Sequence, residues 1–375
     1  MKKGIESALF SILFEGKPTD STVKQLTASH PKWGSRDRKL VIGAVYDMVR
    51  YWLTFCAALE ISSKQTASIE TAVSNYLHPA PAFLHRLTDF TAAPVQQAES
   101  FPDWLVGEMG HEANSIMREL NQPARLSIRV NTLKVTPSQV EQWFTAQGIS
   151  FEKHPQHAEL ILLDKNTKID QTQPYRDGWI EVQDPGSIAI GKMVNPKPGS
   201  IVFDTCAGAG GKSLLLAQMM HNQGQIICAD VHQWKLDELN KRAKRAGISI
   251  CSAQAIKDVS DLDRWQKSAD FVLIDAPCSG TGVIKRKPET KYHLNPTRLN
   301  ELIHLQSQIL KSYSLLSKKG GEIVYATCSI LAKENELQIE DFLKSDHNFE
   351  LVEQQTLLPS RFNDGFFMAK LKRIN

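Results

Sequence analysis

Features that would place the chain in a specialised class of protein are scarce in its 375 residues. The six cysteines include no C-x-x-C pair, which is the usual signature of a zinc site. Apolar runs such as 214–217 are far shorter than the roughly 20 residues that a membrane-spanning helix needs. We therefore expect no metal site and no contact with a membrane.

A secretion signal is also lacking at the start of the sequence. Lys2 and Lys3 precede an apolar stretch, but Glu6 and Glu15 interrupt it and no small-residue cleavage site follows. The even number of cysteines would permit disulfides, although a cytoplasmic chain of this size does not need them. We expect a cytoplasmic monomer whose cysteines remain thiols.

Charge of one sign is not in large excess. Lys and Arg number 44, Asp and Glu number 41, and the formal net charge is +3. This mildly basic balance permits a nucleic-acid partner but does not require one. Apolar residues make up 42% and charged residues 23%, as in an ordinary globular protein. At about 150 residues per domain, the length indicates two or three domains.

Two segments of different character occupy the first half of the sequence. Residues 1–120 are expected to form a helical domain, because apolar residues recur at helical spacing between Leu40 and Leu53. Residues 121–180 are expected to form a small α+β domain. This domain would contain a strand at 126–130 and a helix that begins at Thr136, with proline in its first turn.

The remaining residues, 181–375, alternate short apolar strands with helical stretches. This order is typical of a Rossmann-like α/β fold with a doubly wound, mostly parallel sheet. The expected fold class is therefore α/β, with the helical domain and the small α+β domain in front of it. The strands that we expect in this sheet are 200–204, 225–230, 249–253, 270–275 and 322–327.

A glycine-rich turn follows the first of these strands and opens a helix. Residues 204–213 read D-T-C-A-G-A-G-G-K-S, and their glycines let the backbone turn tightly and approach a ligand. A phosphate-binding P-loop would need glycine at position 206, which is Cys206. The G-x-G-x-x-G pattern fails as well, because position 213 is Ser213. The turn therefore does not predict a nucleotide triphosphatase.

An acidic residue, Asp230, ends the next strand about twenty residues beyond this turn, where a carboxylate can bind both hydroxyls of a ribose. A glycine turn and a ribose acid without a pyrophosphate fingerprint suit an adenosyl ligand that lacks phosphates. S-adenosylmethionine is the obvious candidate. The alternative is an ordinary strand-to-helix turn of an α/β protein.

Two cysteines follow two other strands of the expected sheet. Cys278 lies in D-A-P-C-S-G-T-G at 275–282, and Cys328 lies in T-C-S at 327–329. Ligands of open parallel sheets bind beyond the carboxyl ends of the strands, so both thiols, Asp275 and the glycine turn are expected along one edge. The alternative is that both cysteines are small buried residues.

Thiols beside a methyl donor suit methylation at carbon 5 of a pyrimidine. A thiolate that adds to carbon 6 makes carbon 5 nucleophilic, which divides one difficult step into two easier ones. A second thiol can assist release of the product, Asp275 can hold the polar edge of the base, and Lys212 can supply positive charge. Attack requires a thiolate, so the reactive cysteine needs a lowered pKa. The spacing does not distinguish the nucleophile from the helper.

Six segments, in the same order, resemble the RsmB/Sun (Nop2/Sun) family of RNA cytosine-5 methyltransferases. Residues 204–213 resemble D-x-C-A-A-P-G-G-K-T, 275–282 resemble D-A-P-C-S-G-x-G, and 325–329 resemble Y-x-T-C-S. The other three segments are Arg129–Lys134 (R-V-N-T-L-K), Gln183–Ser187 (Q-D-x-x-S) and Gly365–Leu371 (G-F-F-x-A-K-L).

The resemblance implies a role for each matching residue. Cys328 would be the nucleophile, and Cys278 would assist product release. Asp275 and Lys212 would position and polarise the cytosine. The residues implied to hold S-adenosylmethionine are Cys206, Ala207, Gly208, Ala209, Gly210, Gly211, Lys212, Asp230, Asp258 and Asp275.

The sequence departs from the family pattern at two places. Gly208-Ala209 replaces Ala-Pro in the glycine turn, and loss of the proline is expected to loosen the turn and weaken binding of the donor. The acid on the adenine side should follow the strand 249–253. Asp258 is near that place, although Lys257 is the alternative occupant.

The first 120 residues resemble the NusB-like RNA-binding domain of bacterial members of the family, with S-R-D-R at 35–38 and Y-D-M-V-R at 46–50. This resemblance favours 16S ribosomal RNA of the small subunit as the substrate. The alternatives are a transfer RNA substrate and an RNA-binding ribosome assembly factor with weak activity. A DNA methyltransferase and an amino-group methyltransferase are further alternatives, and the latter would need no thiol.

Two basic runs are possible RNA contacts. Lys241–Arg245 is expected to be the solvated face of a helix. Lys285–Lys287 follows the Cys278 loop and is the better candidate for contact with phosphate. The target base would have to leave its stack to reach a thiol. His293 and His304 are expected to be surface or core residues.

Overall fold

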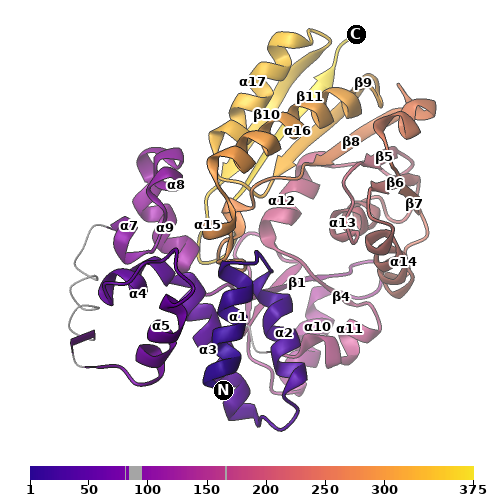
Figure 1. Ribbon diagram of the computed structural model, residues 1–375. Coiled ribbons are helices and arrows are strands. Elements are labelled where there is room, and N and C mark those ends of the chain that lie inside the picture. Colours follow the sequence, from indigo (N-terminus) through magenta and orange to yellow (C-terminus); the bar gives the residue numbers. More distant parts are fainter. Residues whose placement is uncertain (81, 84–94, 165–166) are drawn as a thin grey trace. The chain divides into compact units, whose positions relative to one another are not determined.

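The computed structural model describes residues 1–80, 82–83, 95–164 and 167–375 (Figure 1). The chain divides into two compact units. The helical unit comprises Met1–Pro123 and Val283–Leu299, and the sheet unit comprises Ala124–Gly282 and Asn300–Asn375. Residues 283–299, which the sequence analysis placed with the methyltransferase domain, therefore pack with the N-terminal helices.

Amphipathic helices build the helical unit around one apolar core. Ile5, Leu9 and Ile12 of α1 are fully buried and lie on one helical face. They belong to the same core cluster as Val45 and Met48 of α3. The helices are α1 (Lys2–Leu13), α2 (Thr19–Ser29), α3 (Ser35–Arg50), α4 (Trp52–Ala58), α5 (Ser68–Leu77), α7 (Val95–Ala98), α8 (Asp103–Glu108), α9 (Ala113–Asn121) and α15 (Thr290–His293).

Over the described residues, no single helix is both long and apolar enough to cross a membrane. The pair formed by α3 and α4 meets the length and composition criteria only when the two are taken together, and the pair is bent by 81°.

Buried polar contacts explain why residues 283–299 join the helical unit. The fully buried Lys291 donates through Nζ to the carbonyl of Arg50 at 2.5 Å and to Oδ1 of Asn121 at 3.1 Å. The carboxylate of Glu289 accepts from the backbone N–H of Thr19 at 3.1 Å and from its hydroxyl at 2.8 Å. Unpartnered buried charges are costly, so these bonds fix the segment in place.

His293 and Lys285, whose roles were predicted from the sequence, both lie in the segment 283–299. His293 contacts the carbonyl of Ile12 through Nε2 at 2.6 Å, which is a structural role. Lys285 is buried, and its Nζ lies 3.6 Å from a carboxylate oxygen of Glu119. The run 285–287 was expected to contact phosphate, but the charge of Lys285 is already paired inside the helical unit.

A small antiparallel sheet opens the sheet unit. Its strand order is β2-β3-β1-β4, and α10 packs on it through the buried residues Val140 and Phe144. Thr136 caps α10 as expected, because its hydroxyl accepts from the backbone N–H of Gln139 at 3.4 Å. The elements are β1 (Leu126–Val130), α10 (Pro137–Ala146), β2 (Phe151–Lys153), β3 (Leu160–Leu163), α11 (Gln173–Arg176) and β4 (Ile180–Val182).

The second sheet has seven strands in the order β10-β11-β9-β8-β5-β6-β7. Neighbouring strands from β9 to β7 are parallel, whereas β11 is antiparallel to both β9 and β10. The expected Rossmann-like fold class is confirmed. The strands are β5 (Ile201–Asp204), β6 (Gln225–Asp230), β7 (Cys251–Ala255), β8 (Ala269–Asp275), β9 (Ser317–Thr327), β10 (Phe349–Leu357) and β11 (Phe366–Arg373).

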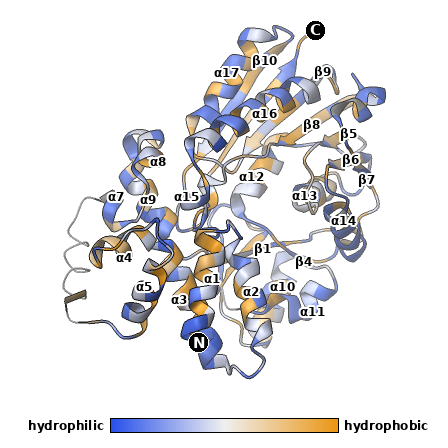
Figure 2. Ribbon diagram, in the orientation of Figure 1, coloured by the Kyte–Doolittle hydropathy of each residue, from blue (hydrophilic) through white to orange (hydrophobic). Residues whose placement is uncertain are grey.

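Helices flank this sheet and bury its apolar side chains. Figure 1 shows α13 and α14 alongside β5 to β7, and α16 and α17 alongside β8 to β11. The strands are largely apolar, while the helices have mixed hydropathy (Figure 2). Phe203, Val272 and Tyr325 from the strands share one core cluster with Leu310 of α16 and Phe342 of α17. The helices are α12 (Pro185–Val194), α13 (Gly211–Met219), α14 (Gln233–Ala246), α16 (Pro296–Ser314) and α17 (Glu336–Ser345).

Candidate active site

The sheet unit brings the motif residues to one edge, as the sequence predicts. β9, β8, β5 and β6 are consecutive parallel neighbours, so their carboxyl ends lie side by side. Asp204, Asp230 and Asp275 are the last residues of β5, β6 and β8, and Thr327 is the last residue of β9. The residues that follow each strand belong to the predicted motifs, so the motif residues come together at this edge of the sheet.

Two glycines of the turn have left-handed backbone conformations, and the requirement for glycine is strictest at Gly210. Gly208 has φ +54° and Gly210 has φ +84°, a left-handed region that residues with a side chain rarely adopt. A Cβ on Gly210 would also lie 2.5 Å from Cγ of Leu239. Asp230, which is 7% exposed, accepts from the backbone N–H of Gly208 at 3.0 Å and so ties the turn to β6.

A buried pair at the base of the turn was not predicted from the sequence. Ser213 donates its hydroxyl to Oδ2 of Asp204 at 2.6 Å. Burial raises the pKa of Asp204 to about 6, because the charged form loses its solvation there. Its other oxygen, Oδ1, is buried without a hydrogen-bond partner among the described residues. The strand end therefore keeps one acceptor oxygen uncommitted.

An open hollow of about 470 Å³ lies after the carboxyl end of β7. Gln254, Lys257, Asp261 and Arg264 are among its lining residues. Asp261 accepts from the backbone N–H groups of Lys257 at 2.8 Å and of Asp258 at 3.3 Å, and these bonds lower its pKa. Asp261 is thus an additional acidic candidate at this end of the site, and it was not predicted from the sequence.

A close ion pair joins α13 to the end of β8. Nζ of Lys212 lies 2.6 Å from Oδ2 of Asp275. Burial by itself lowers the pKa of Lys212, but the charge of Asp275 and its hydrogen bond outweigh that effect, so the pKa is raised. Lys212 therefore remains a cation. The charge of a Cys328 thiolate would raise the pKa of Lys212 further.

The two motif cysteines face each other. Sγ of Cys278 lies 3.3 Å from Sγ of Cys328, within hydrogen-bond range for sulfur. The pKa of Cys278 is raised well above its usual value by this bond and by burial, which keeps Cys278 in the thiol form. All six cysteines lie in the described residues, and none of them forms a disulfide.

Cys206 differs from this pair. Burial raises the pKa of its thiol, and the residue packs against the core of the large sheet. Its place in the glycine turn is therefore compatible with a backbone role rather than with thiol chemistry.

Two glycines let the cysteine loops approach the start of β11. The backbone N–H of Gly282 donates to the carbonyl of Cys328 at 2.9 Å, and the N–H of Gly365 donates to the carbonyl of Gly282 at 2.8 Å. A Cβ on Gly282 would lie 2.1 Å from the carbonyl oxygen of Gly365. The glycine of the D-A-P-C-S-G-T-G segment and that of the G-F-F segment are therefore both needed for this close backbone contact.

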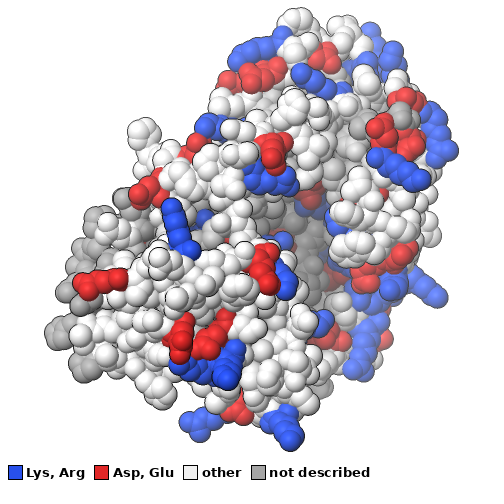
Figure 3. Space-filling view, in the orientation of Figure 1, with Lys and Arg blue, Asp and Glu red and all other residues white. Residues whose placement is uncertain are grey.

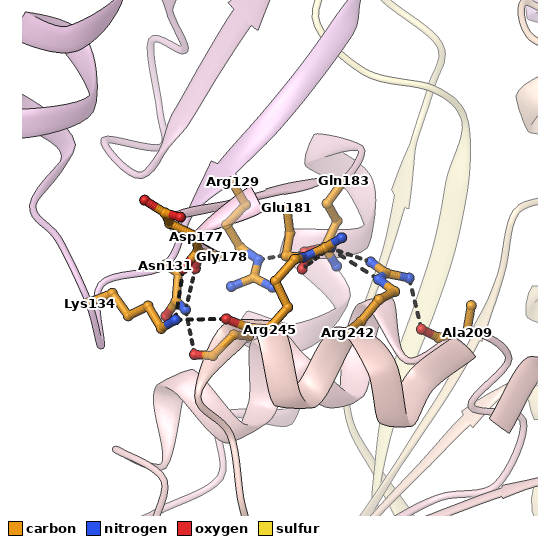
Figure 4. A network of polar contacts seen from close by, with 11 residues as sticks. Arg129, Asn131, Lys134, Asp177, Gly178, Glu181, Gln183, Ala209, Arg242 and Arg245 are labelled. Carbon is orange, nitrogen blue, oxygen red and sulfur yellow. Dashed lines mark hydrogen bonds and ion pairs between the residues drawn. The ribbon is translucent and has the colours of Figure 1, made fainter. Parts of the chain in front are cut away.

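The basic run on α14 is partly structural, contrary to expectation. Glu181 of β4, with a side chain 3% exposed, pairs with Arg242 at 2.9 Å and with Arg245 at 2.6 Å (Figure 4). Because Glu181 is buried, it requires counter-charges, and α14 supplies two of them. Lys241 keeps a side chain that is 76% exposed. On the face shown in Figure 3, basic and acidic side chains are interspersed, and basic ones gather around the position of α14.

Arg242 also reaches the glycine turn. Its guanidinium donates to the carbonyl of Ala209 at 2.8 Å (Figure 4). Ala209 stands where the family pattern has proline, so this bond fixes a backbone segment that proline would otherwise stiffen. The chain Glu181–Arg242–Ala209 thus connects the small sheet to the turn.

The R-V-N-T-L-K segment serves the same connection. Asn131 donates through Nδ2 to the carbonyl of Gly178 at 2.9 Å (Figure 4). It also donates to the carbonyl of Ala246 at 2.9 Å. Arg129 is buried and donates to Oε1 of Gln183 at 2.6 Å, and burial lowers its pKa to about 10. Nε2 of Gln183 donates in turn to the carbonyl of Gly211 at 3.1 Å. Two of the six resembling segments therefore position the glycine turn from outside.

The sheet order, the glycine turn and the acid after β6 define a Rossmann-like methyltransferase. A family model described as 16S rRNA methyltransferase RsmB/F matches residues 191–372, and one described as an RsmF/B-like ferredoxin-like domain matches residues 101–170. The chain is 34% identical over 301 residues to the probable ribosomal RNA small subunit methyltransferase B of Synechocystis, covering 73% of the chain and 67% of that relative. The chain therefore belongs to the RsmB/F family of methyltransferases, which confirms the family and the enzyme class expected from the sequence.

Other relatives agree with this assignment. The Bacillus subtilis protein of the same name is 33% identical over 298 residues, covering 73% of this chain and 66% of its own length. The Escherichia coli ribosomal RNA small subunit methyltransferase B is 30% identical over 302 residues, covering 76% and 68%. The chain thus spans about two thirds of the length of these relatives.

Solved structures show the same fold. PH0851 matches with a TM-score of 0.80 at 25% identity, over 100% of this chain and 99% of that one. A methyltransferase homolog protein from Pyrococcus horikoshii matches with a TM-score of 0.65 at 25% identity, over 78% of this chain and 99% of that one. The NusB-like resemblance of residues 1–120 stays a prediction. Within the described residues, no group of three His, Cys, Asp or Glu side chains is arranged to hold a metal.

Proposed function

We propose that the protein transfers the methyl group of S-adenosylmethionine to carbon 5 of a cytosine in 16S ribosomal RNA. The observation that carries the proposal is the 3.3 Å approach of the Cys278 and Cys328 thiols, near the Lys212–Asp275 pair. An amino-group methyltransferase needs no thiol, and no reaction of an assembly factor needs two. The names of the relatives, which are small-subunit rRNA methyltransferases, favour ribosomal RNA as the substrate.

The residues along the sheet edge fit S-adenosylmethionine. Asp230 lies beyond the glycine turn with a carboxylate that can still accept from ribose hydroxyls, since each oxygen has two lone pairs. The hollow after β7 offers room for an adenine ring beside Lys257 and Asp261. The proposed contacts are residues 206–212, Asp230, Asp258 and Asp275, with Asp261 added.

The protein side chains would carry the reaction as follows. Cys328, as thiolate, adds to carbon 6 of the cytosine and forms a C–S bond, so that carbon 5 becomes the nucleophile. Asp275 and Lys212 hold the polar edge of the base and stabilise the charge that develops on it. The bound cofactor supplies an electrophilic methyl group. Carbon 5 takes the methyl group and then loses its proton to Cys278, which acts as the base after it has given its own thiol proton to solvent. The double bond between carbon 5 and carbon 6 re-forms, the C–S bond breaks, and Cys328 leaves as thiolate.

Loss of Arg242 is expected to weaken cofactor binding. In Arg242→Gln the bond to the carbonyl of Ala209 and the pairing with Glu181 are both reduced, so the glycine turn loses its external support. We expect the Kd for S-adenosylmethionine to rise about tenfold, equivalent to the loss of one charge-assisted hydrogen bond. Isothermal titration of the purified variants measures this constant directly.

The matched control for that experiment is Lys241→Gln, which removes one positive charge from the neighbouring, mostly exposed position. It should leave the Kd within a factor of two of the unmodified protein. Equal constants for Arg242→Gln and the unmodified protein would show that the turn does not depend on this contact.

The proposed function is tested by the identity of the modified nucleoside. Purified protein is incubated with labelled S-adenosylmethionine and with ribosomal RNA, transfer RNA or DNA, and the digested product is analysed by mass spectrometry. We expect 5-methylcytidine from ribosomal RNA. A product from transfer RNA or DNA alone would show that this nucleic acid, and not ribosomal RNA, is the substrate. A methyl group on an exocyclic amine would show that the enzyme methylates amino groups and not carbon 5. No incorporation despite cofactor binding would support the assembly-factor alternative.

A further inference from the structure

A buried carboxylate lies between the two cysteine loops, and it was not among the expected site residues. Glu334 ends η5 (Ala332–Glu334), after β9 and before α17, and its side chain is 0% exposed. Buried carboxylates are uncommon because the charge loses its solvation, so each one needs several donors. The donors around Glu334 come mainly from the two loops that carry the thiols.

One carboxylate holds both loops. Oε2 of Glu334 accepts from the hydroxyl of Ser279 at 2.5 Å and from the hydroxyl of Ser329. Oε1 accepts from the backbone N–H of Ser279 at 2.8 Å. Ser279 directly follows Cys278, and Ser329 directly follows Cys328. Any displacement of this carboxylate is therefore transmitted to both cysteines within one residue.

The surrounding contacts make the arrangement rigid. Nε2 of Gln306 on α16 donates to Oε1 of Glu334 at 2.9 Å and also to the carbonyl of Pro277 at 2.9 Å. The hydroxyls of Thr281 and Ser329 lie 3.0 Å apart and form a second link between the loops. Neutral hydroxyls already connect the two loops. A structural link between the loops therefore does not require the buried carboxylate of Glu334.

We propose that Glu334 is a positioning residue that holds Cys278 and Cys328 face to face through its hydrogen bonds to Ser279 and Ser329. This inference rests on the proposed role of the two thiols. The groups that act on the thiol of Cys278 are Cys328, Glu334 and the backbone of Gly280, whose hydrogen bond lowers the pKa of Cys278. The pKa of Cys278 is raised first by its bond to Cys328, then by burial, and also by the charge of Glu334.

The charge gives the two thiols different roles. A carboxylate beside Cys278 disfavours a thiolate there, whereas Cys328 lies near the cationic Lys212. The nucleophile must be a thiolate, while a residue that assists product release starts as a thiol. The two side chains are chemically identical thiols. The charge of Glu334 would therefore favour Cys328 over Cys278 as the nucleophile.

Two variants separate the geometry from the charge. Glu334→Gln keeps the shape: its amide oxygen can accept from Ser279 N–H and Gln306, and its amide nitrogen can donate to the two serine hydroxyls after they reverse. Glu334→Ala removes both the contacts and the charge. Glu340→Gln, an exposed neighbour on α17, is the matched control for the loss of one carboxylate.

The first readout is kinetic. We expect Glu334→Ala to lower kcat for RNA methylation about a hundredfold, because small misplacements of reacting groups have effects of that size. The Kd for S-adenosylmethionine should stay within a factor of two, since Glu334 binds Ser279, Ser329 and Gln306, which lie outside the glycine turn. Glu334→Gln should give an intermediate kcat, and Glu340→Gln should match the unmodified protein.

The second readout does not depend on any RNA activity. Diamide, which accepts two hydrogens from a pair of neighbouring thiols, should join Cys278 to Cys328 more slowly in Glu334→Ala than in the unmodified protein. In a Cys328→Ser background, adding Glu334→Gln should move the pH profile of Cys278 alkylation to lower pH, with at least about a threefold faster rate at pH 8. Mass spectrometry of peptides resolves each cysteine.

The outcomes distinguish this inference from the proposed function. A folded Glu334→Ala with unchanged kcat and an unchanged rate of thiol joining would overturn the positioning role. An unchanged alkylation profile in Glu334→Gln would overturn the role of the charge. If the unmodified protein methylates no RNA while both thiol readouts behave as expected, the proposed function fails and the positioning of the thiols stands.

Discussion

Replacement of Cys328 by alanine is expected to lower the rate of RNA methylation by at least about three orders of magnitude, since loss of a covalent nucleophile removes the reaction path itself. Cys328 directly follows β9, and its Sγ lies 3.3 Å from that of Cys278. The positive charge of Lys212 acts on Cys328 and favours its thiolate. Single-turnover transfer of labelled methyl groups to RNA measures the effect.

The control for this variant removes a thiol elsewhere in the same unit. Cys251→Ala, at the start of β7, should keep nearly full activity. Cofactor binding should be the same in Cys328→Ala and in the unmodified protein, because the thiol is not part of the glycine turn. Retention of more than a tenth of the activity in Cys328→Ala would rule out this cysteine as the nucleophile.

Loss of the Lys212 charge is expected to be the next largest effect. Lys212→Met should lower kcat/KM about a hundred- to a thousandfold, as is typical when a preorganised charge at a reacting centre is removed. Asp275→Asn should have an effect of similar size, because the two groups form one pair at 2.6 Å. Steady-state kinetics with saturating cofactor provide both values.

The double variant tests whether the two residues act as a unit. If they do, Lys212→Met combined with Asp275→Asn should be no slower than the worse single variant by more than a few fold. Fully multiplicative losses would instead assign the two residues separate tasks. A matched surface change, Lys241→Met, should leave kcat/KM unaltered.

The sheet edge was predictable because parallel topology fixes it. Five apolar strands were expected, and β5, β6, β8 and β9 contain the expected ranges almost completely. Once these strands are parallel neighbours, the residues that follow them must meet, whatever the loops do. The approach of Cys278 to Cys328 followed from that rule and not from any local pattern.

Strand β10 was not expected, for a physical reason. Most of the residues of Phe349–Leu357 are exposed, and their side chains include two glutamates and two glutamines. An edge strand pairs on one side only and faces water, so it lacks the apolar signal of a central strand. Only pairing with β11 defines it.

Polar contacts between residues far apart in the chain could likewise not be predicted from the sequence. Arg242 belongs to a basic run that resembles any solvated helix face, and its partner Glu181 lies 61 positions away in the chain. Glu334 likewise binds Ser279 across 55 positions. Periodicity reports which face of an element is buried, but the pairing of buried charges depends on tertiary contacts that a single sequence does not encode locally.

The central claim, that Cys328 bonds covalently to the RNA base and Cys278 frees it, is tested most directly by trapping. Cys278→Ala is incubated with S-adenosylmethionine and substrate RNA, denatured, and examined for a protein–RNA adduct by gel shift and by mass spectrometry of the linked peptide. We predict a stable adduct on the peptide that contains Cys328, and none in Cys328→Ala. An adduct that forms in Cys328→Ala instead would reverse the two thiols, and its absence from both variants would contradict covalent catalysis.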